Sequence, residues 1–156
     1  MNIAIFGDSF ANGETDGSFK LNHLGLTQYL MDEGHFVVNF SRQGNSNQGV
    51  IEDYSYHLRQ NLHLKFDIAL VFQTEPSRET QEWINHIKSG KSVNDVDVHM
   101  IKKYYGELLK SQKAFGVPIY LIGGTTDTLS PEVIKECGLN SACQSVVNLV
   151  LTGEHL

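Results

Sequence analysis

The sequence has only two cysteines among its 156 residues, and this scarcity limits the kinds of protein it can be. Five residues separate Cys137 from Cys143, and no second pair accompanies them to complete a zinc site. Two thiols also do not form the disulfide framework that stabilises small secreted domains. We therefore expect two free thiols in a reducing compartment and no bound metal ion.

Long apolar runs and dense basic stretches are also missing. No apolar run approaches the roughly 20 residues that a membrane span needs. The net charge is −6, which argues against nucleic acid or an anionic membrane as the main partner. A strand pattern starts at residue 2, where a secretory leader would have a basic region and an apolar core. These features predict a cytoplasmic location.

Two signatures of phosphate binding are absent after the first apolar run. A dinucleotide fingerprint needs G-x-G-x-x-G, but Gly7 is followed by Asp8 and Ser9, and the next glycine is Gly13. The acidic residue would also stand where a pyrophosphate must come close. No Gly-Lys-Ser/Thr sequence follows directly after this first run to form a P-loop. We therefore expect no cofactor.

Short apolar runs alternate with amphipathic segments along the chain. The predicted strands, almost wholly apolar, are 2–6, 35–40, 68–72 and 119–123. Helical spacing of apolar residues predicts helices at 21–33, 46–62 and 97–115, and Ser130-Pro131-Glu132 is typical of another helix start. The segment 145–151 fits either a fifth strand or the end of a helix. The segment 74–96 predicts a loop with a short helix around Trp83, in a position to lie over a site.

Alternating strands and helices with apolar strands define an α/β domain, with a buried parallel sheet and helices on both faces. The length fits a single domain over residues 1–156. Ligands of such sheets bind beyond the carboxyl ends of the strands. In the strand order 2-1-3-4-5, the loops after the first three strands converge around Ser9. Those loops are 7–9, 41–47 and 73–78.

Two of these loops resemble those of a known family. A first strand ending in Gly-Asp-Ser, followed by a second ending in Asn-x-Ser-x-x-Gly, is similar to the SGNH (GDSL) hydrolases; the blocks here read GDSF at 7–10 and NFSRQG at 39–44. The resemblance implies a flavodoxin-like three-layer α/β/α fold, with a parallel sheet of four to five strands in the order 2-1-3-4-5. It also implies ester hydrolysis through an acyl-serine. By this likeness Ser9 is the nucleophile and Gly44 supplies an oxyanion-hole N–H.

The chemistry of the residues agrees with those roles. A serine hydroxyl needs a base to take its proton before it attacks a carbonyl. At a strand-to-helix turn, backbone N–H groups such as those of Ser9 and Gly44 can meet the developing oxyanion. The candidate substrate-binding residues around Ser9 are Asp8, Asn45, Asn47, Thr74 and Arg78. Asp8 is expected mainly to order the turn.

The sequence departs from the family in its second half. The third block, Gly-x-Asn-Asp, is replaced by QTEPSR at 73–78, so the third oxyanion donor would come from Gln73, Thr74 or Arg78, or from Asn45 or Asn47 of the neighbouring loop. The fourth block, Asp-x-x-His, occurs only at 32–35, which is at the amino end of the predicted sheet. His155 is the only histidine after the fourth strand. We therefore expect His155 to be the general base, oriented by Glu154, Asp127 or a backbone carbonyl.

Two alternatives stand beside an esterase that acts on a small-molecule or carbohydrate ester. A serine at a strand-to-helix turn can also simply cap the helix, in which case the chain would be a non-catalytic binding or structural module that retains the fold. The chain could also be C-terminally incomplete, so that a longer protein carries the missing Asp-x-x-His block.

Overall fold

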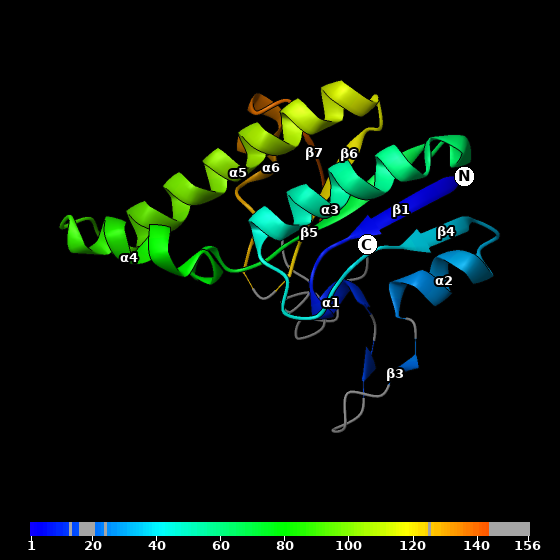
Figure 1. Ribbon diagram of the computed structural model, residues 1–156, viewed down its shortest axis with the longest axis horizontal. Coiled ribbons are helices and arrows are strands. Elements are labelled where there is room, and N and C mark those ends of the chain that lie inside the picture. The colour runs from blue at the N-terminus through cyan, green and yellow to red at the C-terminus, as the bar shows by residue number, and fades with distance from the viewer. Residues whose placement is uncertain (13, 16–20, 24, 125, 144–156) are drawn as a thin grey trace.

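The computed structural model describes residues 1–12, 14–15, 21–23, 25–124 and 126–143, and it centres on one parallel sheet (Figure 1). The sheet has five strands in the order β4-β1-β5-β6-β7. In chain order of these strands this is 2-1-3-4-5, which confirms the predicted topology. The strands are β1 (Asn2–Phe6), β4 (Phe36–Asn39), β5 (Ile68–Gln73), β6 (Ile119–Gly123) and β7 (Asn140–Cys143).

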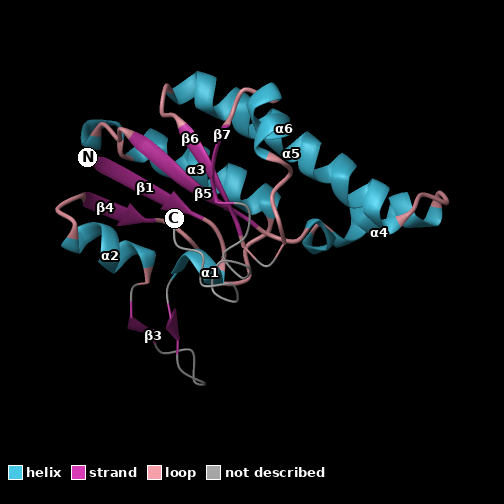
Figure 2. Ribbon diagram, turned by 180° about the vertical axis from the view of Figure 1, so that it is seen from behind, coloured by secondary structure: helices cyan, strands magenta, loops and turns pink. Residues whose placement is uncertain are grey.

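Helices cover both faces of this sheet and produce three layers (Figures 1 and 2). One face packs against α3 (Asn47–Gln60), α5 (Val93–Phe115) and α6 (Pro131–Glu136). The opposite face packs against α1 (Ser9–Asn12) and α2 (Leu26–Asp32). The described part of the chain contains no helix that combines the length and the apolar character needed to cross a bilayer.

The two faces of the sheet have separate apolar cores because alternate strand residues point in opposite directions. In β1, Ala4 and Phe6 face α3 and α5, whereas Ile3 and Ile5 face α1 and α2. From α3, one buried residue per helical turn enters the first core: Val50, Tyr54 and Leu58. The i, i+4 spacing seen in the sequence therefore marks the buried stripe of this helix.

Serine caps set where three helices begin. The hydroxyl of Ser46 accepts a hydrogen bond from the backbone N–H of Gly49, at 3.1 Å, at the start of α3. Ser130 starts α6 in the same way, as predicted. The long helix α5 starts at Val93, four residues before the predicted start at 97, because Ser92 caps it by accepting from the Asp95 N–H.

The predicted helix over 21–33 is wrong at its start. Leu21–His23 is a short strand, β3, which pairs antiparallel with β2 (Glu14–Thr15). Gly25, with φ of +54°, then turns the chain into α2. The backbone N–H and C=O groups of β3 find partners in β2 instead of within a helical turn. The spacing of apolar residues does not reveal this pairing.

The fifth strand of the sheet is Asn140–Cys143, just before the candidate segment 145–151, which lies outside the described residues. Cys143, at its end, and Cys137 are both free thiols. The short helix predicted around Trp83 is confirmed as α4 (Thr80–Lys88). Two one-turn 3₁₀ helices complete the fold, η1 (Leu62–Leu64) and η2 (Pro76–Arg78).

α4 packs along the first half of α5, and the pair extends past the carboxyl end of the sheet (Figures 1 and 2). The Trp83 indole N–H donates to a carboxylate oxygen of Asp97 at 2.8 Å. The Lys103 ammonium contacts both carboxylate oxygens of Glu82 at 2.7 and 2.9 Å. These contacts hold α4 against α5.

Candidate active site

Ser9 is the first residue of α1, at the carboxyl end of β1, and is partly exposed. The turn that delivers it depends on Gly7. A Cβ atom on Gly7 would lie 2.6 Å from the Cβ of Phe72 and 2.8 Å from that of Ala11. Only glycine lets β1 pass so close to β5 and then turn directly into the helix.

Asp8 orders this turn with a fully buried carboxylate. One oxygen accepts a hydrogen bond from the Phe10 backbone N–H at 3.0 Å, which caps the short helix that carries Ser9. The other oxygen lies 3.4 Å from an Nη atom of Arg78 and has no hydrogen-bond partner among the described residues. Asp8 thus connects the Ser9 turn to the loop that follows β5.

Arg78 joins three loops. Its Nε contacts a carboxylate oxygen of Glu75 at 2.6 Å, within its own loop. One Nη donates to the backbone carbonyl of Asn45 at 2.9 Å, in the loop after β4, and the other contacts Asp8. The fork geometry of a guanidinium suits it to bind several acceptors at once. The side chain is 28% exposed, so part of it still faces solvent.

Asn45, Asn47 and Thr74 bind the same loops to one another. The Asn45 amide donates to Asp53 at 2.8 Å and lies 3.4 Å from the carbonyl oxygen of Gly7. The Asn47 amide pairs with the backbone of Thr74 in both directions, with both distances 2.9 Å. The Thr74 hydroxyl donates to Glu75. All three side chains are buried, so their polar groups mainly hold loop to loop.

Gly44 lies in an exposed turn at the end of the β4 loop. Its φ of +70° is the left-handed conformation that favours glycine, and the Asn45 N–H closes the turn on the Arg42 carbonyl at 3.3 Å. The Arg42 N–H donates to the Gly7 carbonyl at 3.0 Å and so ties this loop to the end of β1. Apart from its two chain neighbours, no described residue has an atom within 4 Å of a Cβ built on Gly44, so conformation rather than crowding explains the glycine.

Gln73, one of the candidate oxyanion donors, is fully buried and already bonded. The oxygen of its side-chain amide accepts a hydrogen bond from the Tyr105 hydroxyl at 2.7 Å. The nitrogen of the same amide donates to the backbone carbonyl of Asp127 at 3.0 Å. It therefore anchors the loop after β6 to β5 and α5.

Asn39, the first residue of the NFSRQG block, has a positioning role that the sequence analysis missed. Its amide donates to the Ala11 carbonyl at 2.7 Å and to the Thr27 hydroxyl at 2.9 Å, while its oxygen accepts from Ser41. It thus holds α1, and Ser9 with it, against α2 and β4. The sequence feature that could have revealed this role is an asparagine at the end of an otherwise apolar strand.

His155, the predicted base, and Glu154 lie outside the described residues, as does the ring of His23. Among the histidines whose rings are described, none hydrogen-bonds to Ser9. His35 lies 3.4 Å from the N-terminal nitrogen, at the amino edge as expected, and His57 stacks on Phe40. His86 and His99 contact each other in the α4–α5 pair.

Metal coordination finds no support in the part of the chain that the structure describes. No group of three or more histidine, cysteine, aspartate or glutamate side chains there is arranged to hold an ion. The polar groups around Ser9 instead form a hydrogen-bonded network that connects the loops after β1, β4 and β5.

This arrangement is the fold of the SGNH-hydrolase family esterases, as the resemblance in the sequence implied. AlinE4, an SGNH-hydrolase family esterase, superposes with a TM-score of 0.60 at 15% identity, over 99% of this chain and 84% of its own. The psychrotrophic esterase EstA from Pseudoalteromonas sp. gives 0.58 at 14% identity, over 98% of this chain and 81% of its own.

A catalytic mutant of Axe2, an acetylxylan esterase from Geobacillus stearothermophilus, is also similar. Its TM-score is 0.53 at 14% identity, over 99% of this chain and 81% of its own. No protein-family model and no curated protein sequence matches this chain. The likeness therefore lies in the fold, and the function must be argued from the residues around Ser9.

Proposed function

We propose that this protein is a serine esterase that hydrolyses an ester of a small molecule or a carbohydrate through Ser9. The observation that carries the proposal is the Gly7-Asp8-Ser9 turn. It presents a partly exposed serine at the first position of a helix, at the carboxyl end of β1. The esterase fold shared with AlinE4, EstA and Axe2 supports it.

The proposed reaction has two steps. The Ser9 hydroxyl oxygen attacks the ester carbonyl carbon while a base takes its proton, and the base returns that proton to the departing alcohol. Water then cleaves the acyl-serine in the same manner and releases the carboxylic acid. The backbone N–H groups of Ser9 and Gly44 are the proposed donors to the oxyanion in both steps. His155 is the proposed base, with Glu154, Asp127 or a backbone carbonyl to orient it.

The remaining polar residues divide into two proposed roles. Asp8, Asn45, Asn47 and Thr74 position the three loops, because their side chains are buried and bonded to other parts of the site. Arg78 is the proposed contact to substrate, because part of its guanidinium side chain remains exposed. It stands in the loop where the family has the asparagine that supplies the third oxyanion donor.

Labelling with a fluorophosphonate probe and turnover of p-nitrophenyl acetate test this function. The wild type should gain one probe mass and release p-nitrophenol, and Ser9→Ala should do neither while it melts as the wild type does. Ser77→Ala is the matched control, since Ser77 is an exposed serine in the neighbouring loop, and it should keep both properties. An unlabelled, inactive wild type would contradict the proposal, as would labelling that survives Ser9→Ala.

The substrate class can be separated in the same assay. Because Axe2 is an acetylxylan esterase, acetylated xylan serves as the carbohydrate ester, and p-nitrophenyl acetate and butyrate serve as small esters. Release of acetate from xylan that depends on Ser9 would favour a carbohydrate substrate. Hydrolysis of the small esters alone would favour a small-molecule substrate.

A further inference from the structure

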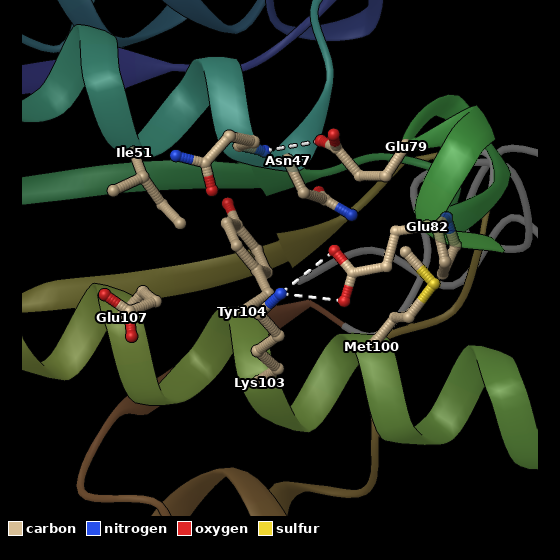
Figure 3. A pocket seen from close by; sticks show the side chains of 10 residues that line it. Asn47, Ile51, Glu79, Glu82, Met100, Lys103, Tyr104 and Glu107 are labelled. Atoms are coloured by element: carbon tan, nitrogen blue, oxygen red, sulfur yellow. Dashed lines mark hydrogen bonds and ion pairs between the residues drawn. The ribbon is translucent and has the colours of Figure 1, made fainter. Parts of the chain in front are cut away.

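A pocket of about 240 Å³ lies on the α3 and α5 side of the sheet (Figure 3). Its walls come from the first turns of α3, from η2 and α4, and from the middle of α5. Ser9 and Gly44 are not among the described residues that line it. The lining residues are Asn47, Gln48, Ile51, Pro76, Glu79, Glu82, Met100, Lys103, Tyr104 and Glu107.

Tyr104 supplies a buried hydroxyl to the lining of this pocket. The residue is only 4% exposed, and its hydroxyl has no hydrogen-bond partner among the described residues. Figure 3 shows its ring rising from α5 across the pocket toward the start of α3. Buried hydroxyls in proteins normally have a partner, since an unpaired one loses its hydrogen bonds to water without replacement. A ligand group in the pocket would supply the partner that the described residues do not.

The hydroxyl acts as a donor at ordinary pH. Burial raises the pKa of Tyr104 well above its usual value, and Tyr105 and the Asp8 carboxylate raise it further. The phenol therefore stays protonated, and it can donate to a neutral acceptor such as a carbonyl oxygen.

The rest of the lining disfavours an anion and offers hydrogen-bond acceptors. Glu82 is paired with Lys103, and Glu107 with Lys110, so these carboxylates are largely compensated. Glu79 accepts a hydrogen bond from the Gln48 backbone N–H at 2.8 Å through one oxygen, and no cation is paired with it in the described part of the chain. A ligand carboxylate would face this surplus of negative charge, whereas an N–H donor would be attracted to it.

The body of the pocket is apolar. Ile51, Pro76, Met100 and the ring of Tyr104 contribute carbon surface between the polar groups. A mainly apolar cavity with a few directed polar groups is typical of small-molecule sites.

We propose that this pocket binds a small uncharged carboxamide with an apolar substituent. The carbonyl oxygen of the ligand accepts from the Tyr104 hydroxyl, its N–H₂ group donates to the Glu79 carboxylate, and its apolar part contacts Ile51 and Met100. Asn47 belongs both to this pocket and to the bridge with Thr74, so an occupied pocket would adjoin the loop network around Ser9.

A titration followed by amide NMR shifts tests the proposal with three probes of similar size. Benzamide has the acceptor and the donor, benzoate replaces the donor with negative charge, and toluene has neither. Benzamide should shift the amide signals of Ile51, Met100 and Tyr104 and bind more tightly than the other two. Tyr104→Phe removes only the hydroxyl, and it should weaken benzamide about three- to tenfold.

Two further variants make the test decisive. Ile51→Phe narrows the pocket and should weaken benzamide without a fall in the melting temperature that would indicate unfolding. Ser9→Ala should bind benzamide as the wild type does, so a failure of the esterase proposal leaves this test intact. The proposal is overturned if no shift appears up to the solubility of benzamide, if benzoate binds equally well, if Tyr104→Phe binds unchanged, or if the shifts centre on Ser9 and Gly44.

Discussion

The guanidinium of Arg78 lies 3.4 Å from the fully buried carboxylate of Asp8, and this pair joins the loop after β5 to the turn that carries Ser9. The two residues are distant in sequence, and each has a second task. Asp8 caps α1, and Arg78 also binds Glu75 and the Asn45 carbonyl. Much of the geometry around Ser9 therefore depends on the Arg78 side chain.

Replacement of Arg78 by methionine should lower the free energy of unfolding by about 2 kcal/mol. It leaves the Asp8 carboxylate buried without its counter-charge, which costs more than the loss of an exposed pair. Arg42→Met is the control, because Arg42 pairs with Asp53 but is 59% exposed, and we expect a loss under about 1 kcal/mol. Urea unfolding measures both.

A double-variant cycle refines this prediction. Asp8→Asn keeps an acceptor for the Phe10 N–H and removes the charge, so the combination with Arg78→Met should lose less stability than the sum of the single variants. Strict additivity, or a loss for Arg78→Met no greater than that for Arg42→Met, would show that the pair does not hold the turn.

Gly7→Ala should destabilise the protein by about 1–3 kcal/mol, because the added methyl group overlaps Phe72 and Ala11. Gly106→Ala is the matched control. Gly106 is an exposed residue inside α5, and apart from the surrounding helix backbone no described residue has an atom within 4 Å of a Cβ built there. Alanine at this position should therefore add about 0.5–1 kcal/mol of stability. Thermal melts that show equal shifts for the two variants would contradict the close approach of β1 to β5.

Gly44→Val should cost about 1 kcal/mol or more in stability and about a hundredfold in ester turnover. The stability loss comes from φ of +70°, which a β-branched residue rarely adopts, and the activity loss from displacement of the proposed oxyanion donor. Gly34→Val is the control, since Gly34 has φ of +85° and equally open surroundings at the end of α2. If both variants lose turnover in proportion to stability, Gly44 has no role in the site.

The buried tyrosines should differ in what their hydroxyls contribute. Tyr54 donates to the Val117 carbonyl at 3.0 Å, so Tyr54→Phe should cost about 1 kcal/mol by leaving that carbonyl unpaired. Tyr104→Phe should be neutral or stabilising, because its hydroxyl has no partner to lose among the described residues. Chemical denaturation of the two variants compares them directly, and a larger loss for Tyr104→Phe would mean that its hydroxyl is bonded.

Local patterns in the sequence were sufficient for most of the fold. Apolar runs identified β1, β4, β5 and β6, and capping serines and apolar spacing identified α3 and α6. The error at 21–25 arose because the strand pair β2–β3 depends on a partner segment, which periodicity within one segment does not report. The early start of α5 was readable from Ser92, three residues before Asp95, but apolar spacing alone did not show it.

The sequence by itself determined the α/β class, the Gly7-Asp8-Ser9 turn and the loops that surround it, because strand burial, helix capping and glycine turns are local properties. Only the tertiary structure decided how the polar residues of those loops are used. Gln73 is bonded to Tyr105, 32 residues away, and Asn47 to Thr74, 27 residues away, whereas the Tyr104 hydroxyl has no bond among the described residues. Whether a buried polar group is satisfied depends on which distant segments the fold brings within hydrogen-bond distance, and no local pattern contains that information.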